Sequence, residues 1–315
     1  MNVLFIDSVH PILEEKLTLS GYQCVNGTEW REEQIFLEIG KFQGVVIRSK
    51  FPIDEKFLLA AKQLKFIARS GAGLENIDLE AANKRGITVF NSPEGNRNAV
   101  AEHALGMLLM LFNKMKQGDD EVRHGQWNRE KNRGIELDGL TVGLIGYGNT
   151  GQRFAKKMLG FDVEVLAYDK YVSKFQDSNA RSVSLEEIQE NADVISFHVP
   201  ETNETRYMLN TAFVKACRKP FFVINTSRGK VVDSSALVEG LKSKKIRGAC
   251  LDVLEYETKA FGNFIEKETP LDFQYLARSS RTVLTPHVAG WTQESYVKLA
   301  TSLYDKIIRE FGEVN

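Results

Sequence analysis

A glycine-rich loop between an apolar run and an amphipathic segment is the feature that most restricts the fold of this chain. The sequence TVGLIGYGNTGQRFAKK, residues 141–157, places Gly146, Gly148 and Gly151 at the spacing G-x-G-x-x-G. After a buried strand, the first glycine permits a tight turn, the second lets a pyrophosphate approach the backbone, and the third lets the helix pack closely. A simple strand-to-helix turn can show the same spacing, so the loop alone does not decide the function.

The sequence around the loop favours a dinucleotide site. The helix that follows would direct the backbone N–H groups of its first residues, Asn149 and Thr150, towards phosphates. The next apolar run, VEVLAYD, ends in Asp169, close to the interval of about 20 residues at which an acid meets the ribose hydroxyls. An acid there favours NAD, because it would repel the 2′-phosphate of NADP, although the adjacent Lys170 would tolerate that phosphate. A nucleotide-binding methyltransferase is the alternative that the loop alone leaves open.

Two series of alternating strands and helices surround this loop. In the first third, NVLFID, GVVIRS, LKFIARSGAG and GITVFNSP read as strands, and DEKFLLAAKQ and DLEAANKR read as helices. A long helical stretch begins near Asn98, and a second series then supplies six strands: LTVGLIG, VEVLAYD, DVISFHVP, FFVINTS, RGACLDV and TVLTPH. The chain ends in an amphipathic helix. We therefore predict an α/β protein with two doubly wound parallel sheets, a Rossmann domain inserted in a flavodoxin-like domain.

Composition excludes several classes of function. The formal net charge of -1 over 315 residues gives no concentrated basic face for nucleic acid. The chain has three cysteines, Cys24, Cys217 and Cys250, which lie far apart in the sequence. Their odd number and wide spacing indicate a reducing compartment and no zinc site. No apolar run approaches the roughly 20 residues of a membrane span. The sequence before Pro11 has no basic segment typical of a signal peptide. We therefore expect a cytoplasmic protein with no metal, membrane or nucleic-acid partner.

Three further segments place polar residues at the ends of predicted strands. Arg228 follows FFVINTS, the acids Asp252, Glu255 and Glu257 follow RGACL, and His287 follows TVLTP. Carboxyl ends of parallel strands meet at one edge, where open α/β sheets bind ligands. An arginine can clamp a carboxylate, and a histidine backed by an acid can accept a hydroxyl proton as hydride leaves the carbon. Each residue alone could be a surface charge or a turn residue, but a methyltransferase would leave Arg228 and His287 without a task.

The chain resembles the D-isomer-specific 2-hydroxyacid dehydrogenases along nearly its whole length. The segments GLIGYGNTG, NTSRGKVVD, LDVLEYE and LTPHVAG are similar to four signatures of that family and occur in the same order. The resemblance implies that Arg228 holds the substrate, that Glu257 orients and charges a histidine, and that His287 is the general acid-base. It also implies cofactor contacts by Thr226 and Ser227 in the loop beside the cofactor, by His198 and Pro200 on the adenosine side, and by Asp252 facing the nicotinamide carboxamide.

The resemblance also implies a domain organisation. Residues 1–97 and 288–315 would form the substrate-binding domain, and residues 98–287 the NAD-binding domain, with a hinge that closes the cleft. Backbone N–H groups of Gly71, Ala72 and Gly73 would bind the substrate carboxylate. The connector that begins near Asn98 resembles a dimerisation region, so we expect a homodimer.

The sequence departs from the family pattern at one loop. Thr258 follows the predicted catalytic glutamate where the family usually has proline, and the interval from Glu257 to His287 is longer than is typical. These differences leave the identity of the acid beside His287 open. Glu255 is the alternative, because residues two apart in an extended segment share a face.

The resemblance narrows the substrate further. Arg48 and Arg69, at strand ends of the first domain and with Lys50 nearby, are either solvated charges or a pocket for a second anion such as phosphate. They resemble the pattern in D-3-phosphoglycerate dehydrogenases, so we favour that branch and a 2-hydroxy or 2-oxo acid substrate. The chain would lack the C-terminal regulatory domains of many such enzymes, so we expect no serine control. A glyoxylate or hydroxypyruvate reductase and an NAD(H)-sensing corepressor are the alternatives.

Overall fold

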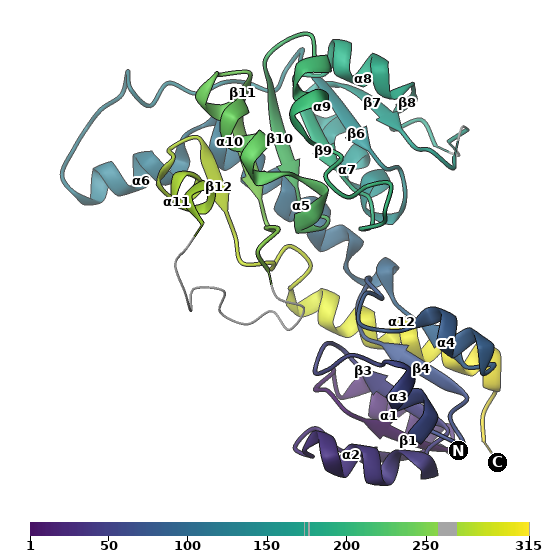
Figure 1. Ribbon diagram of the computed structural model, residues 1–315. Helices are drawn as coiled ribbons and strands as arrows, with labels where there is room; N and C mark the ends of the chain where they lie inside the picture. The colour runs from purple at the N-terminus through teal and green to yellow at the C-terminus, as the bar shows by residue number, and fades with distance from the viewer. Residues whose placement is uncertain (173, 176, 258–269, 315) are drawn as a thin grey trace. The chain divides into compact units, whose positions relative to one another are not determined.

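The chain divides into two compact units in the computed structural model, which describes residues 1–172, 174–175, 177–257 and 270–314 (Figure 1). The first unit comprises Met1–Arg97 and Trp291–Asn315, and the second comprises Asn98–Gly290. Each unit is built on one parallel sheet with helices on both faces. The predicted fold class is confirmed.

The first unit contains a five-stranded parallel sheet in the order β2-β1-β3-β4-β5. This order is that of the flavodoxin-like fold, in which ligands bind where the strand order reverses, here between β1 and β3. The strands are β1 (Asn2–Phe5), β2 (Gln23–Asn26), β3 (Gly44–Ile47), β4 (Phe66–Arg69) and β5 (Thr88–Phe90). The helices are α1 (Ile12–Leu19), α2 (Glu32–Glu38), α3 (Glu55–Ala60), α4 (Leu79–Lys84) and α12 (Gln293–Phe311).

Both faces of the first sheet are buried. Because successive residues of a strand point to opposite faces, Val3 and Phe5 of β1 pack with α1 and α12, whereas Leu4 packs with α2, α3 and α4. The central strand must therefore be apolar at every position, and β1 and β3 are almost entirely buried.

The second unit contains a seven-stranded parallel sheet in the order β12-β11-β10-β9-β6-β7-β8. From β6 to β11 this is the Rossmann order, with β12 added at one edge. The strands are β6 (Thr141–Ile145), β7 (Glu164–Tyr168), β8 (Arg181–Ser182), β9 (Val194–Phe197), β10 (Phe221–Asn225), β11 (Ile246–Leu251) and β12 (Thr282–Leu284). The helices are α5 (Pro93–Phe112), which begins in the first unit, α6 (Met115–Arg123), α7 (Asn149–Met158), α8 (Leu185–Asn191), α9 (Thr211–Ala216), α10 (Ser234–Lys242) and α11 (Leu271–Arg278).

Two apolar cores cover the faces of this second sheet. Helices α8, α9, α10 and α11 pack on one face, and α5 and α7 pack on the other. Because the strands are parallel, the carboxyl ends of β6, β9, β10, β11 and β12 lie at one edge of the sheet, and the strand order reverses between β6 and β9. The loops at this edge contain the glycine-rich sequence and the predicted catalytic residues.

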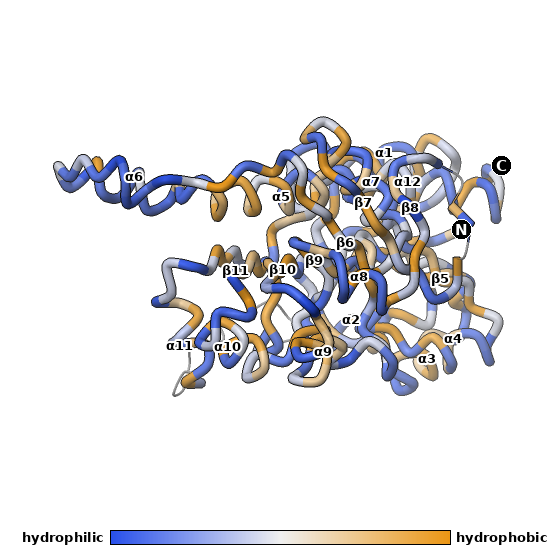
Figure 2. The backbone as a smooth tube through the Cα atoms, turned by 90° about the horizontal axis from the view of Figure 1, so that it is seen from above, coloured by the Kyte–Doolittle hydropathy of each residue, from blue (hydrophilic) through white to orange (hydrophobic). Residues whose placement is uncertain are grey.

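The structure adds three details to the predicted elements. Two short strands, β2 and β8, were not among those expected. The helical stretch from Asn98 begins earlier, at Pro93, a residue well suited to the first position of a helix. It also breaks into α5 and α6, because Lys114 has a left-handed backbone with φ 51°. Figure 2 shows α5 as largely hydrophobic and α6 as mainly hydrophilic.

Candidate active site

The loop after β10 holds Arg228 through a buried amide. Asn225, at the end of the strand, donates from Nδ2 to the carbonyl oxygen of Arg228 at 2.9 Å and accepts from the amide of Ser227 at 3.1 Å. The next residue, Gly229, lies against the chain after β11, since a Cβ there would be 2.0 Å from the carbonyl oxygen of Leu254. The glycine therefore allows the Arg228 loop to lie directly beside the segment that contains Glu257.

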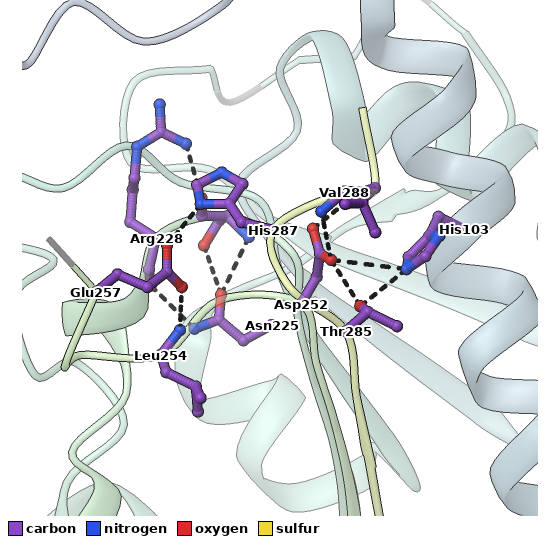
Figure 3. A network of polar contacts seen from close by, with 11 residues as sticks. His103, Asn225, Arg228, Asp252, Leu254, Glu257, Thr285, His287 and Val288 are labelled. Carbon is purple, nitrogen blue, oxygen red and sulfur yellow. Dashed lines mark hydrogen bonds and ion pairs between the residues drawn. The ribbon is translucent and has the colours of Figure 1, made fainter. Parts of the chain in front are cut away.

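Glu257 is the acid that contacts the predicted catalytic histidine. Its Oε2 atom lies 2.6 Å from Nδ1 of His287, and its Oε1 atom accepts from the amide of Leu254 (Figure 3). The two side chains are about a quarter exposed, 24% and 28% respectively, so the pair is partly shielded but open to a ligand. Glu255 instead accepts from the amide of Ser234, at the start of α10. Of the two acids that the sequence left open, Glu257 is the one paired with His287.

Asp252 imposes an unusual backbone conformation on His287. The histidine has φ 55°, in the left-handed region that non-glycine residues seldom occupy. Its amide donates to the carbonyl oxygen of Asp252 at 2.8 Å, and the amides of Val288 and Ala289 donate to the Asp252 carboxylate at 2.9 and 2.8 Å. The carboxylate is almost fully buried. Strained backbone persists where the surroundings hold it in place, and here Asp252 does so.

A second histidine, His103 of α5, supports the same turn. Its Nε2 atom lies 3.0 Å from Oγ1 of Thr285, and that hydroxyl donates to Asp252 at 2.6 Å (Figure 3). Sequence reasoning missed His103, because a histidine within an apolar helix carries no signal of its own. Thr285 could have been noticed as the polar residue next to the TPH turn.

The glycine-rich loop has the geometry predicted for each glycine. Gly146 has φ 93°, and a Cβ on Gly151 would lie 2.3 Å from the carbonyl oxygen of Gly146. Nothing lies within 4 Å of the position that a Cβ on Gly148 would take, so the backbone there is open to an approaching group. Helix α7 begins at Asn149, and its first N–H groups and the positive end of its dipole therefore lie beside that opening.

The carboxylate of Asp169 lies at the end of β7 beside this loop. It accepts from the amide of Tyr147 at 2.8 Å and from the amide of Tyr171 at 2.9 Å. Lys170, the cation that could have favoured a 2′-phosphate, pairs with Glu204 at 2.6 Å. The charge next to the loop is therefore that of the acid.

Residues 105–289 match the family model for the NAD binding domain of D-isomer specific 2-hydroxyacid dehydrogenases. The chain belongs to this family. It is 33% identical to the hydroxypyruvate reductase of Thermotoga maritima over 91% of each chain. It is 34% identical to the D-3-phosphoglycerate dehydrogenase of Archaeoglobus fulgidus over 98% of this chain and 57% of that protein. The chain spans about half the length of the D-3-phosphoglycerate dehydrogenases that it matches.

Solved structures show the same fold. The D-lactate dehydrogenase of Aquifex aeolicus, solved with NAD and lactic acid, superimposes with a TM-score of 0.83 at 29% identity, and 99% of this chain and 96% of that chain are covered. The fold is therefore that of the 2-hydroxyacid dehydrogenase family.

The second unit fits the NAD expected of a domain from this family. Besides the open backbone at Gly148, the buried Oγ1 of Thr226 has no hydrogen-bond partner among the described residues, as expected of a group that would bond to a ligand. Ser227 is also buried. His198 lies under the loop, where burial lowers its pKa to about 3 and keeps the imidazole neutral. Pro200 is exposed nearby, and its carbonyl oxygen accepts from Thr205.

The predicted substrate residues lie together in the first unit, at the carboxyl ends of β3 and β4. Arg48 follows Ile47, which is in register with Arg69. The guanidinium of Arg69 lies over the turn at Gly71, where a Cβ would be 1.7 Å from its Nη1 atom. Ala72 is held by Asn91, which donates to its carbonyl oxygen at 2.6 Å, and Gly73 follows in the same half-buried loop.

Lys50 does not join this group of cations. Its ammonium donates to the carbonyl oxygens of Ile6, Thr28 and Trp30, which use all three of its N–H groups. It therefore ties three loops together instead of presenting charge to a ligand.

Thr258, where the family pattern is broken, and the rest of 258–269 lie outside the described residues. Within the described ranges there is no cluster of three potential metal ligands. A search of the same residues finds no helix long and apolar enough to cross a membrane.

Proposed function

We propose that this chain is an NAD-dependent oxidoreductase that interconverts a D-2-hydroxy acid and the corresponding 2-oxo acid. The contact between Glu257 and His287 carries the proposal, because it is made at the edge of the sheet that also holds Arg228 and the glycine-rich loop. Lactate appears in the solved structure of a relative, and hydroxypyruvate in the name of another, so the substrate class is supported by members of the family.

Each of the three residues has a distinct role in the proposed reaction. NAD, held by the glycine-rich loop and Asp169, would supply the acceptor for the hydride from C2 of the hydroxy acid. Because Nδ1 of His287 is occupied by Glu257, the hydroxyl proton goes to Nε2, and Glu257 keeps the imidazole in that orientation. Arg228 holds the substrate carboxylate with its planar fork of N–H donors. In the reduction of a 2-oxo acid, His287 returns the proton to the carbonyl oxygen.

We further propose 3-phosphoglycerate and 3-phosphohydroxypyruvate as the substrate pair. Arg48 and Arg69 would bind the phosphate, and the N–H groups of residues 71–73 the carboxylate. Several D-3-phosphoglycerate dehydrogenases are about a third identical to this chain, which supports this choice. Hydroxypyruvate is the alternative, because the Thermotoga maritima reductase matches over 91% of both chains.

The function is tested by screening 2-oxo acids for reduction with NADH and NADPH. The panel would contain 3-phosphohydroxypyruvate, hydroxypyruvate, glyoxylate and pyruvate. We expect the highest kcat/KM for 3-phosphohydroxypyruvate with NADH, because Asp169 would repel a 2′-phosphate while Lys170 is paired with Glu204. Equal kcat/KM values for 3-phosphohydroxypyruvate and hydroxypyruvate would contradict the assignment of Arg48 and Arg69 to the phosphate. A protein that binds NADH but reduces no 2-oxo acid would be a sensor of the corepressor type.

We also propose that the chain forms a homodimer through α5, α6 and the segment that follows. Met115, Val122 and Trp127 are large apolar side chains there with exposed fractions of 51%, 53% and 78%. Met115 and Val122 are seven residues apart on α6 and therefore share one face of the helix, and exposed apolar side chains on one face typically mark an interface. The double substitution Val122→Arg and Trp127→Arg should yield monomers in sedimentation equilibrium, whereas Leu37→Arg, an exposed leucine of the first unit, should not.

We assign the protein to a reducing compartment, the cytoplasm. All three cysteines are free thiols, and two of them, Cys217 and Cys250, are buried apart from one another in the second unit. Fractionation of cells that contain the tagged protein tests this assignment.

A further inference from the structure

The start of α12 fixes the position of one exposed tryptophan. Thr292 is the N-cap, and its hydroxyl accepts from the amide of Ser295 at 3.0 Å while the Ser295 hydroxyl accepts from the amide of Thr292 at 2.9 Å. This reciprocal pair is a capping box. Trp291 precedes the cap, and its ring lies 6.1 Å from that of Tyr296, four residues into the helix. An apolar contact between these two positions fixes the angle at which the chain enters a helix.

Further contacts support this arrangement from the loop after β1. The ring of His10 meets Tyr296 edge-on at 5.2 Å, and Nδ1 of His10 accepts from the amide of Ile12 at the start of α1. The indole of Trp291 is therefore held by a helix cap and a neighbouring ring, although 56% of the residue is exposed. The indole belongs to none of the apolar cores of the described residues.

The face of Trp291 carries the guanidinium of Arg48. The Cζ atom of Arg48 lies 4.3 Å from the centre of the indole, within the range of a cation–π contact. The main chain of Arg48 is fixed as well, because its amide donates to Asp7 at 2.7 Å and its carbonyl oxygen accepts from Asn76 at 3.3 Å. No acid forms an ion pair with Arg48 among the described residues.

This geometry leaves Arg48 suited to bind an anion. Stacking uses the face of the guanidinium, whereas its N–H donors lie in the plane and bind carboxylate or phosphate with two bonds. One of them, at Nη1, makes a long contact of 3.4 Å with the carbonyl oxygen of Ser8. Since Lys50 is bound to backbone carbonyl groups, Arg48 is the cation that the loop after β3 presents.

We infer that Trp291 is a positioning residue that holds Arg48 for the second anionic group of the substrate. It would thereby contribute to the selection of phosphorylated over unphosphorylated 2-oxo acids. The inference rests on the proposed function, since it assigns a determinant of specificity to the same reaction. Because Trp291 would act through Arg48, replacement of Trp291 should weaken recognition of the substrate phosphate.

The test compares kcat/KM for 3-phosphohydroxypyruvate and hydroxypyruvate in wild type and Trp291 variants. Trp291→Leu keeps an apolar side chain against Tyr296 but removes the aromatic face. We expect the ratio of the two kcat/KM values to fall by about twofold to fivefold, the range of an exposed cation–π contact, mainly through KM of the phosphorylated substrate. Trp291→Phe, which keeps a weaker face, should lower the ratio less.

Two controls separate this effect from a general loss of structure. Phe36→Leu removes another aromatic ring of the first unit, the centre of which lies 5.0 Å from Nζ of Lys56. This variant should leave the ratio of the two kcat/KM values as in wild type. In an Arg48→Gln background, Trp291→Leu should cause no further fall, because the partner through which it acts is gone.

The outcomes distinguish this inference from the proposed function. If wild type prefers the phosphorylated substrate and Trp291→Leu preserves that preference in full, the role of Trp291 is refuted and the function stands. The same follows if Trp291→Leu lowers the ratio equally with and without Arg48. If wild type reduces no 2-oxo acid, or reduces both substrates equally well, the inference is refuted together with the phosphate assignment.

Discussion

Nδ1 of His287 lies 2.6 Å from Oε2 of Glu257, although the two residues are 30 positions apart in the sequence. A carboxylate at this distance fixes the tautomer and the orientation of the imidazole. The same histidine has a left-handed backbone that the buried Asp252 holds in place. Two acids thus act on one histidine, one on its ring and the other on its main chain.

Removal of the imidazole should abolish most of the activity but preserve cofactor binding. For His287→Ala we expect kcat to fall by roughly 10²–10⁴-fold, the range for loss of a general acid-base. Steady-state kinetics and NADH fluorescence titration measure the two effects. Glu257→Gln should also lower kcat, whereas Glu255→Gln is the matched control, because Glu255 binds the start of α10. A His287→Ala enzyme with near-normal kcat would contradict the assignment.

Replacement of Asp252 by asparagine should displace the histidine turn. The amide nitrogen of asparagine would face backbone N–H groups that now donate to both carboxylate oxygens. A buried unsatisfied donor costs about 1–3 kcal/mol, so we expect lower stability in urea unfolding as well as lower kcat. Asp78→Asn is the control, since Asp78 caps α4 and asparagine caps helices equally well. Equal stabilities of the two variants would argue against the role of Asp252.

Alanine substitutions in the glycine-rich loop should separate folding from cofactor binding. A Cβ on Gly148 meets nothing within 4 Å, so Gly148→Ala should keep the wild-type Tm and raise the Kd for NADH. A Cβ on Gly151 would collide with the backbone of Gly146 at 2.3 Å, so Gly151→Ala should lower Tm. Thermal unfolding and NADH titration of both variants test the contrast. Unchanged NADH affinity in Gly148→Ala would show that the cofactor does not approach the loop there.

His198 should make the fold sensitive to acid. Its pKa is about 3 in the folded protein and about 6.5 when unfolded, so the unfolded chain binds more protons between these values. Stability should therefore fall as the pH drops below about 6.5, by up to about 1.4 kcal/mol per pH unit from this residue. Urea unfolding at several pH values should show a shallower decline for His198→Gln. Identical pH profiles would mean that the pKa of His198 is the same in the folded and the unfolded protein.

The buried thiols should be inert towards thiol reagents. Burial raises the pKa of Cys217 to about 12 and raises that of Cys250 further above its ordinary value. Because the thiolate is the reactive form, alkylation at pH 8 should proceed only as fast as the protein unfolds. Mass spectrometry of native and urea-treated protein measures the rates at each cysteine. Rapid labelling of Cys250 in the native protein would contradict its burial.

Much of the architecture was predictable because it depends on local patterns. Apolar runs of strand length between helical segments predicted two parallel sheets, and the glycine spacing identified the strand after which the glycine-rich loop lies. The predicted strand ends also placed Arg228, Asp252 and His287 at one edge of the sheet, because the carboxyl ends of parallel strands lie at the same edge. Short strands such as β8, with two exposed residues, have no such pattern and were missed.

The identity of each polar partner depended on the tertiary structure. Glu255 and Glu257 share a face in an extended chain, but only the folded loop decides that one binds Ser234 and the other His287. Likewise, Lys50 and Arg48 look equivalent in sequence, yet one is bound to three carbonyl oxygens and the other lies on Trp291. Periodicity and spacing determine which elements form and where they end. Hydrogen bonds of a few ångströms between distant segments determine which charge remains for chemistry, and these exist only once the chain has folded.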